Sequence, residues 1–119
     1  IAMFPEGTTS SGHGLRAFHA NLVQAAVATG TPVQPVALRF SDAHAPISAA
    51  AAYIDDMTLL ASLWHIVWAE RLCVDVTLLM PIETEERDRR SVSQEARQAI
   101  AATLQIDAAE VLPPLADTA

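Results

Sequence analysis

The residue types best suited to chemistry lie near the start of the sequence, in the stretch Phe-Pro-Glu-Gly-Thr-Thr-Ser at residues 4–10. A carboxylate, a glycine and three hydroxyl groups follow directly after an apolar run. Glycine lets a backbone approach a ligand closely, and backbone amides and hydroxyls can hold an anion. Glu6 argues against a simple phosphate cradle, because its charge repels an anion unless a cation such as Arg16 lies between them. On composition alone, a polar surface turn is the simpler explanation.

Hydrophobic periodicity predicts the elements that would position this stretch. Strands are expected at residues 1–4, 33–40 and 72–80, and helices at 15–29, 57–69 and 92–104. Gly30 is expected to end the first helix, and a Ser-Val-Ser-Gln capping box at residues 91–94 to open the last. Because strands and helices alternate, the pattern predicts an α/β fold with a mostly parallel sheet flanked by helices. Ligands bind such sheets beyond the carboxyl ends of the strands, where the loop at residues 5–14 would lie.

The composition narrows the classes of function. The chain has 119 residues, which suits one domain, and a net charge of −7. An acidic chain is poorly suited to nucleic acid and to electrostatic adhesion to anionic lipid. The single cysteine, Cys73, excludes an internal disulfide and a Cys-rich metal site. No metal site is expected, because the histidines lack the spacing of metal ligands on one helix. No bound cofactor is expected either. The histidines are His13, His19, His44 and His65.

Three further side chains are assigned to packing rather than chemistry. Trp64 and Trp68 lie one turn apart on the helix expected at residues 57–69. They could line an acyl tunnel, but packing in the core is the simpler explanation. Cys73 lies on an expected strand and is interpreted as a small core residue, not a nucleophile.

The stretch at residues 4–10 resembles a block of the glycerophospholipid acyltransferase family, which reads F-P-E-G-T-R-S or F-P-E-G-T-T-S. Members of this family move a fatty acyl group from a thioester to a lysolipid or a glycerol phosphate. The strand at residues 33–38, which contains Pro35, resembles the family's fourth block. The likeness is sharp over residues 1–40, and residues 56–80 resemble bacterial members more loosely.

The resemblance implies that the chain is one part of a single acyltransferase domain. The family's catalytic block is H-x-x-x-x-D, in which His acts as general base and Asp orients it. No such block occurs in residues 1–119. We therefore expect the chain to be the C-terminal portion of a truncated acyltransferase fold, inactive alone, with an extended tail at residues 105–119.

The resemblance also assigns site residues. In the family the E-G-T-R block recognises the acceptor, and its arginine helps to bind the phosphate. The residues assigned to acceptor binding are Glu6, Gly7, Thr8, Thr9 and Arg16, and those assigned to the structure of the motif are Phe4, Pro5 and Pro35. Thr9 stands where the family's arginine would be, so the missing charge would have to come from Arg16.

The implied activity of the whole protein is lysolipid O-acylation. Acyl-CoA or acyl-carrier protein would be the donor, and 1-acylglycerol-3-phosphate the acceptor, in phospholipid biosynthesis. Some bacterial members that read E-G-T-T acylate lyso-ornithine lipid, whose amine could pair with Glu6, and this acceptor is an alternative. A non-catalytic α/β binding or assembly domain is another.

The resemblance also implies a location. The whole protein would act at the cytoplasmic face of the inner membrane, with membrane contact through a missing N-terminal half. The chain by itself is expected to be soluble. Apolar surface left exposed where that half would dock could drive the chain to form a homodimer.

Overall fold

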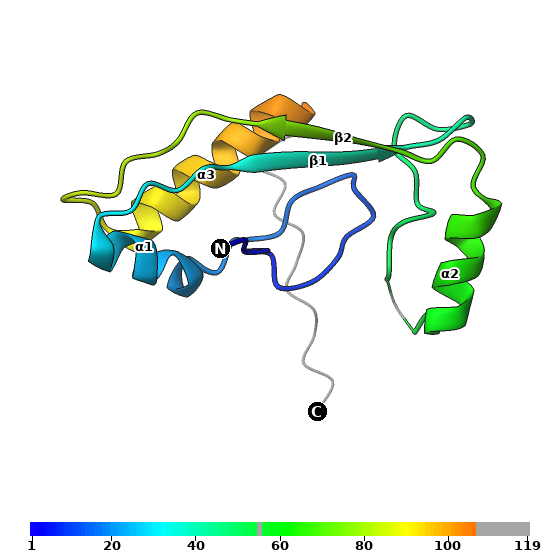
Figure 1. Ribbon diagram of the computed structural model, residues 1–119, viewed down its shortest axis with the longest axis horizontal. Coiled ribbons are helices and arrows are strands. Elements are labelled where there is room, and N and C mark those ends of the chain that lie inside the picture. The colour runs from blue at the N-terminus through cyan, green and yellow to red at the C-terminus, as the bar shows by residue number, and fades with distance from the viewer. Residues whose placement is uncertain (55, 107–119) are drawn as a thin grey trace.

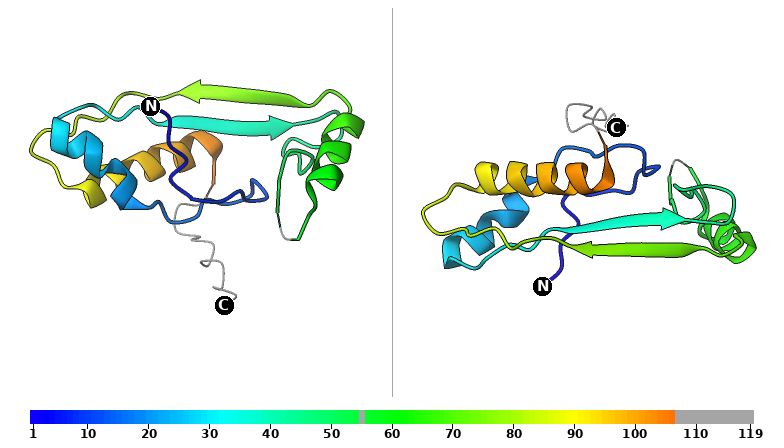
Figure 2. Two further views of the ribbon diagram at one scale, coloured as in Figure 1. Left: turned by 60° about the horizontal axis from the view of Figure 1, so that its bottom comes forward. Right: turned by 90° about the horizontal axis from the view of Figure 1, so that it is seen from above.

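The computed structural model describes residues 1–54 and 56–106, so residues 107–119 of the tail expected at 105–119 lie outside them. Gln105, at the start of that expected tail, is the C-cap of α3. The elements in chain order are the 3-10 helix η1 (Ala20–Val23), α1 (Gln24–Thr29), β1 (Val36–Ser41), α2 (Leu59–Trp68), β2 (Cys73–Leu78) and α3 (Arg89–Leu104). The two strands form a long pair, and α3 runs along one face of it (Figures 1 and 2). Helix α2 lies beyond one end of the pair (Figure 1).

The two strands pair in antiparallel fashion, with Val36 opposite Leu78 and Ser41 opposite Cys73. The sequence-based prediction of a mostly parallel sheet is therefore wrong for the described residues, although the mixture of helices and strands is confirmed. A parallel pair needs a connection that carries the chain back along the sheet. Here the connection through α2 stays beyond the end of β1, so the chain re-enters the sheet in the opposite direction (Figure 1).

The first helix is shorter than its apolar pattern predicts. Residues 15–19 are not helical, and the helical segment begins with η1 at Ala20. The predicted end is confirmed, because Gly30 caps α1 with a φ of 64°, in the left-handed region that glycine adopts without strain. The strand predicted at residues 1–4 does not form, and these residues are exposed.

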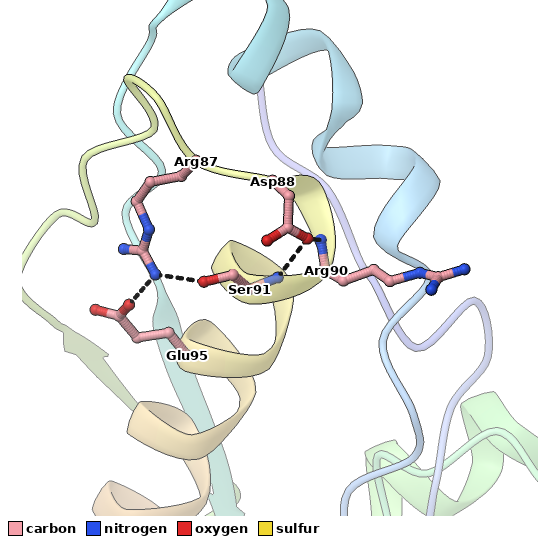
Figure 3. Close-up of polar contacts among 5 residues, drawn as sticks. All are labelled: Arg87, Asp88, Arg90, Ser91 and Glu95. Atoms are coloured by element: carbon pink, nitrogen blue, oxygen red, sulfur yellow. Dashed lines mark hydrogen bonds and ion pairs between the residues drawn. The ribbon is translucent and has the colours of Figure 1, made fainter.

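Helix α3 begins earlier than the capping box at residues 91–94 predicts. Its N-cap is Asp88, whose carboxylate accepts hydrogen bonds from the backbone N–H groups of Arg90 (2.9 Å) and Ser91 (3.1 Å) (Figure 3). An aspartate is a strong N-cap because it satisfies amide donors that have no partner within the helix. The amide of Ser91, and after it that of Arg90, hold the pKa of Asp88 below its ordinary value of 3.8. Arg87 braces the same turn by donating to Ser91 Oγ (2.8 Å) and to Glu95 (2.6 Å) (Figure 3).

The core lies where α3 meets β1 and the segment around η1. One cluster of buried side chains joins Leu15 to α3, and a second joins Val23 to α3. The buried members of the two clusters are Leu15, Ala37, Ile100 and Ala101, and Val23, Ile82, Val92 and Ala96. Every cluster thus includes residues of α3, so this helix organises the packed part of the described molecule.

The opposite face of the strand pair and most of α2 are uncovered. Val36, Leu38 and Phe40 alternate onto the face of β1 away from the buried Ala37, and apolar residues of β2 lie opposite them in the register. Trp64 and Trp68 stack on each other with ring centroids 5.6 Å apart and are 61% and 69% exposed, so the prediction that they pack in the core is wrong.

Cys73 is also exposed, contrary to the prediction of a core residue. In the described part of the chain, no helix combines the length and apolar character that crossing a membrane requires.

Candidate functional site

The motif at residues 4–10 opens with a tight turn. The N–H of Gly7 donates to the carbonyl of Phe4 (3.1 Å), and the carbonyl of Pro5 accepts from the N–H of His19 (2.8 Å). Gly7 has a φ of 68°, and a Cβ atom built on it would lie 3.1 Å from His19 Nε2. Only glycine satisfies both the left-handed backbone and this close approach without strain. The turn is therefore held against the start of η1.

Glu6 points back toward the chain from this turn. Its Oε2 atom accepts a hydrogen bond from the backbone N–H of Arg16 at 3.1 Å. Within the described residues, Oε2 is the only oxygen of this carboxylate for which a hydrogen bond is found. The structure therefore brings Glu6 and Arg16 together, as their proposed shared role requires, but through the backbone of Arg16.

The hydroxyl residues that follow line an exposed loop. The Thr9 hydroxyl donates to the carbonyl of Tyr53, and Ser10 Oγ accepts from the N–H of Gly12 at 3.4 Å. Thr8 is exposed. Thr9 thus ties the motif to the loop after β1, a contact between residues far apart in the sequence.

The three residues assigned to the structure of the motif differ in burial. Phe4 is 76% exposed and Pro5 is half-buried. Pro35 is buried directly before β1, and its carbonyl accepts from the N–H of Leu79 at 3.0 Å. Proline lacks an N–H, so a place at the start of a strand, where its carbonyl alone is used, suits it.

Arg97 belongs to this site, and the sequence reasoning missed it. Its Nε donates to the carbonyl of Arg16 at 3.0 Å and its Nη2 to the carbonyl of Leu15 at 2.9 Å. These bonds use the carbonyls of residues 15 and 16, which lie in the non-helical segment before Ala20. A signal was present, because Arg97 lies on the buried stripe of α3 between Ser93 and Ala101.

Other charged residues serve local structure. Asp42 accepts from the N–H groups of His44 (2.8 Å) and Ala45 (2.9 Å) and from the hydroxyl of Ser48. The Ser48 hydroxyl, and then the His44 amide, keep the pKa of Asp42 below its ordinary value of 3.8. Among residues 1–54 and 56–106, no three His, Cys, Asp or Glu side chains gather as metal ligands would.

Comparisons with known proteins agree with the motif. The family model described as Acyltransferase matches residues 1–39, which include the turn, Glu6 and Arg16. The lyso-ornithine lipid O-acyltransferase of Pseudomonas aeruginosa is 39% identical over 100 residues, which are 84% of this chain and 38% of that protein. The 1-acyl-sn-glycerol-3-phosphate acyltransferases of Neisseria gonorrhoeae and Neisseria meningitidis are each 35% identical over 109 residues, 91% of this chain and 42% of theirs.

No solved structure shows significant similarity to the chain. The chain spans about two fifths of the length of these curated relatives. Over most of its own length the chain is similar to these members of the glycerophospholipid acyltransferase family.

Proposed function

We propose that the whole protein containing this chain transfers a fatty acyl group from a thioester to the free hydroxyl of a lysolipid. The observation that carries the proposal is the motif turn, in which Gly7 and His19 pack together and Glu6 is held by the Arg16 amide. A fixed carboxylate next to the backbone of an arginine is suited to orienting a polar headgroup. Acyl-CoA or acyl-carrier protein is the proposed donor.

In the proposed reaction the acceptor hydroxyl attacks the thioester carbonyl, a general base takes the hydroxyl proton, and the thiol leaves. The base is proposed to lie outside residues 1–119, since these contain no H-x-x-x-x-D block. The proposed contribution of residues 4–16 is to bind the acceptor and to aim its hydroxyl. Such positioning can supply several kcal/mol, about 7 or more in favourable cases.

The first proposed acceptor is 1-acylglycerol-3-phosphate, the substrate named for the two Neisseria relatives. Its phosphate needs a cation, and Arg16 is attached to the backbone that holds Glu6. The proposed place of action is the cytoplasmic face of the inner membrane, because the acceptor is a membrane lipid and the donor a water-soluble thioester.

Lyso-ornithine lipid is the second proposed acceptor. Two observations favour it: the Pseudomonas aeruginosa relative named for this lipid is 39% identical, and Thr9 replaces the arginine expected for a phosphate acceptor. The Thr9 hydroxyl donates its hydrogen bond to the carbonyl of Tyr53. Glu6 would then pair with the amine of the ornithine headgroup.

The experiment that tests the proposal gives the whole protein one labelled acyl thioester and both lysolipids in parallel. Transfer to 1-acylglycerol-3-phosphate supports the first acceptor and a phosphate contact from Arg16. Transfer to lyso-ornithine lipid alone supports the second. Transfer to neither lipid overturns the proposed function and favours a non-catalytic binding or assembly domain.

A further inference from the structure

The peptide unit between Leu15 and Arg16 is hydrogen-bonded on both of its sides. Its carbonyl oxygen, on Leu15, accepts from Arg97 Nη2 at 2.9 Å. Its N–H, on Arg16, donates to Glu6 Oε2 at 3.1 Å. A trans peptide is planar and its C=O and N–H point in opposite directions. One rigid plane therefore separates the guanidinium of Arg97 from the carboxylate of Glu6.

A second bond from Arg97 fixes the orientation of this plane. Its Nε donates to the next carbonyl, that of Arg16, at 3.0 Å. A guanidinium is planar and presents its donors in a fixed fork, so two bonds to successive carbonyls define the direction of the backbone between them. The plane cannot rotate away from Glu6 without breaking a bond to Arg97.

Arg97 is itself held on a rigid support. It lies on α3, which runs from Arg89 to Leu104 and is packed into both core clusters. The neighbouring buried positions on the same stripe are Ser93 and Ala101, at 4% and 1% exposure. Because the helix fixes the backbone of Arg97, only its side chain must be ordered for it to hold residues 15–16.

The arrangement also strengthens the bond to Glu6. A cation that accepts the electron density of a carbonyl polarises the peptide and makes its N–H a better donor. The charge of Arg97 thus acts on Glu6 through the peptide.

We propose that Arg97 is a positioning residue that orients the Glu6 carboxylate for the acceptor through the Leu15–Arg16 peptide. The proposal rests on the proposed function, in which Glu6 meets the headgroup of the lysolipid. It differs from a purely structural role because the effect of Arg97 on catalysis must pass through Glu6.

The test uses the whole protein and a double-mutant cycle of Glu6→Ala and Arg97→Ala, followed by initial rates of acyl transfer. Arg97→Ala alone is expected to lower kcat/KM for the acceptor by about tenfold to a hundredfold, with the KM of the thioester unchanged. Once Glu6 is absent there is no carboxylate to orient. Adding Arg97→Ala to Glu6→Ala should therefore change the rate by no more than about twofold.

Arg89→Lys and Arg97→Lys form a matched pair. Arg89 lies on the same helix and also bonds to an element far away in the sequence. Its Nη1 donates to Gln24 Oε1 at 3.2 Å, on α1 and not on residues 15–16. Lysine lacks the fork that spans two carbonyls. Arg97→Lys should reduce acceptor kcat/KM about tenfold, whereas Arg89→Lys should leave it within about twofold. Equal losses from the two variants would contradict the proposal.

Hydrogen exchange at the Arg16 amide gives a readout that does not depend on activity. The amide should exchange faster in Arg97→Lys than in Arg89→Lys, because its bond to Glu6 is no longer supported. If the wild-type protein acylates neither lipid, the proposed function fails, and this measurement alone decides whether Arg97 holds Glu6. Multiplicative losses in the cycle, or unchanged Arg16 exchange in Arg97→Lys, would overturn the proposal.

Discussion

Two regions of the molecule differ sharply in how completely they are packed. Around α3, the two clusters of buried side chains and the hydrogen bonds of Arg97 connect residues 15–16, η1 and β1. On the far face of the strands and on α2, large apolar side chains are exposed, and Ser62 is the buried residue of α2. The acceptor motif is itself exposed or half-buried, and the bond from the Arg16 amide to Glu6 ties it to the packed region. The residues that hold Glu6 are therefore anchored in the core, while the far face of the strands and α2 stay exposed in the described structure.

The contrast predicts very different effects for the same substitution in two helices. Ile100 of α3 is 9% exposed and Ile66 of α2 is 40% exposed. Ile100→Ala should lower the free energy of unfolding of the 119-residue chain by about 2–4 kcal/mol, because it leaves a cavity in the core. Ile66→Ala should cost less than about 1 kcal/mol. Urea unfolding of both variants measures the two free energies. Equal losses of stability would contradict the difference in packing between α3 and α2.

An added methyl group should lower the activity at the motif turn but not at another turn of the same backbone geometry. Gly7 and Gly30 have φ values of 68° and 64°. A Cβ atom at Gly7 would lie 3.1 Å from His19, whereas one at Gly30 would lie 3.4 Å from the flexible Glu85 side chain. Both alanine variants should lose about 1–2 kcal/mol of stability.

In the whole protein only Gly7→Ala should also lower acceptor kcat/KM, by about tenfold. The measurement is initial acyl transfer at several acceptor concentrations. An equal loss of activity in Gly30→Ala would show that general stability, not the turn, determines the rate.

The stability of the packed region should also depend on pH, through the Asp88 N-cap at the start of α3. Hydrogen bonds lower the pKa of Asp88 in the folded state. A lowered pKa stabilises the fold at pH values above the unfolded pKa of 3.8, and this contribution is lost as the pH falls toward the folded pKa. Asp88→Ala should therefore reduce the urea midpoint near neutral pH and flatten its fall below about pH 4.

Asp42 shares this pKa direction, so part of the acid dependence should persist in Asp88→Ala. Asp42→Ala serves as the comparison, because it changes the loop after β1 and leaves the α3 cap intact. A pH profile of Asp88→Ala identical to that of the wild type would contradict the cap's role.

The smallest expected effect is spectroscopic. Trp64 and Trp68 are exposed in the described structure and are the only tryptophans in the sequence. In the 119-residue chain their fluorescence should resemble tryptophan in water and be quenched readily by iodide. In the whole protein a blue shift is expected if another segment covers α2. Protected, blue-shifted emission in the 119-residue chain would show that it covers this surface itself, as a homodimer would.

Local sequence patterns predicted several elements of the fold. The apolar period placed α2 well, and glycine chemistry placed the end of α1 at Gly30. The orientation of the strands could not be predicted, because it depends on where the connection through α2 runs in space. The start of α3 was missed because Asp88 competes with Ser91 as a cap, and the carboxylate wins by accepting two amide bonds.

The acceptor role of residues 4–10 stays a prediction. The motif was identified from its resemblance to an acyltransferase block, because its composition alone favoured a polar surface turn. Its support was not, since Arg97 is 81 residues from Arg16 in the sequence and is brought to it only by packing. The exposed tryptophans were misassigned for a related reason: an apolar helix pattern shows that a surface prefers burial, not which segment buries it.

In the proposed function the charge of Glu6 recognises the acceptor, and a single substitution isolates that charge. Glu6→Gln keeps an oxygen that can accept from the Arg16 amide but removes the charge. Glu70→Gln is the matched control, because Glu70 is an exposed carboxylate outside the motif. Its Oε2 lies 3.4 Å from His44 Nε2. Glu6→Gln in the whole protein should lower acyl transfer to its lysolipid about tenfold or more, whereas Glu70→Gln should leave it unchanged. Full activity of Glu6→Gln on both lysolipids would contradict it.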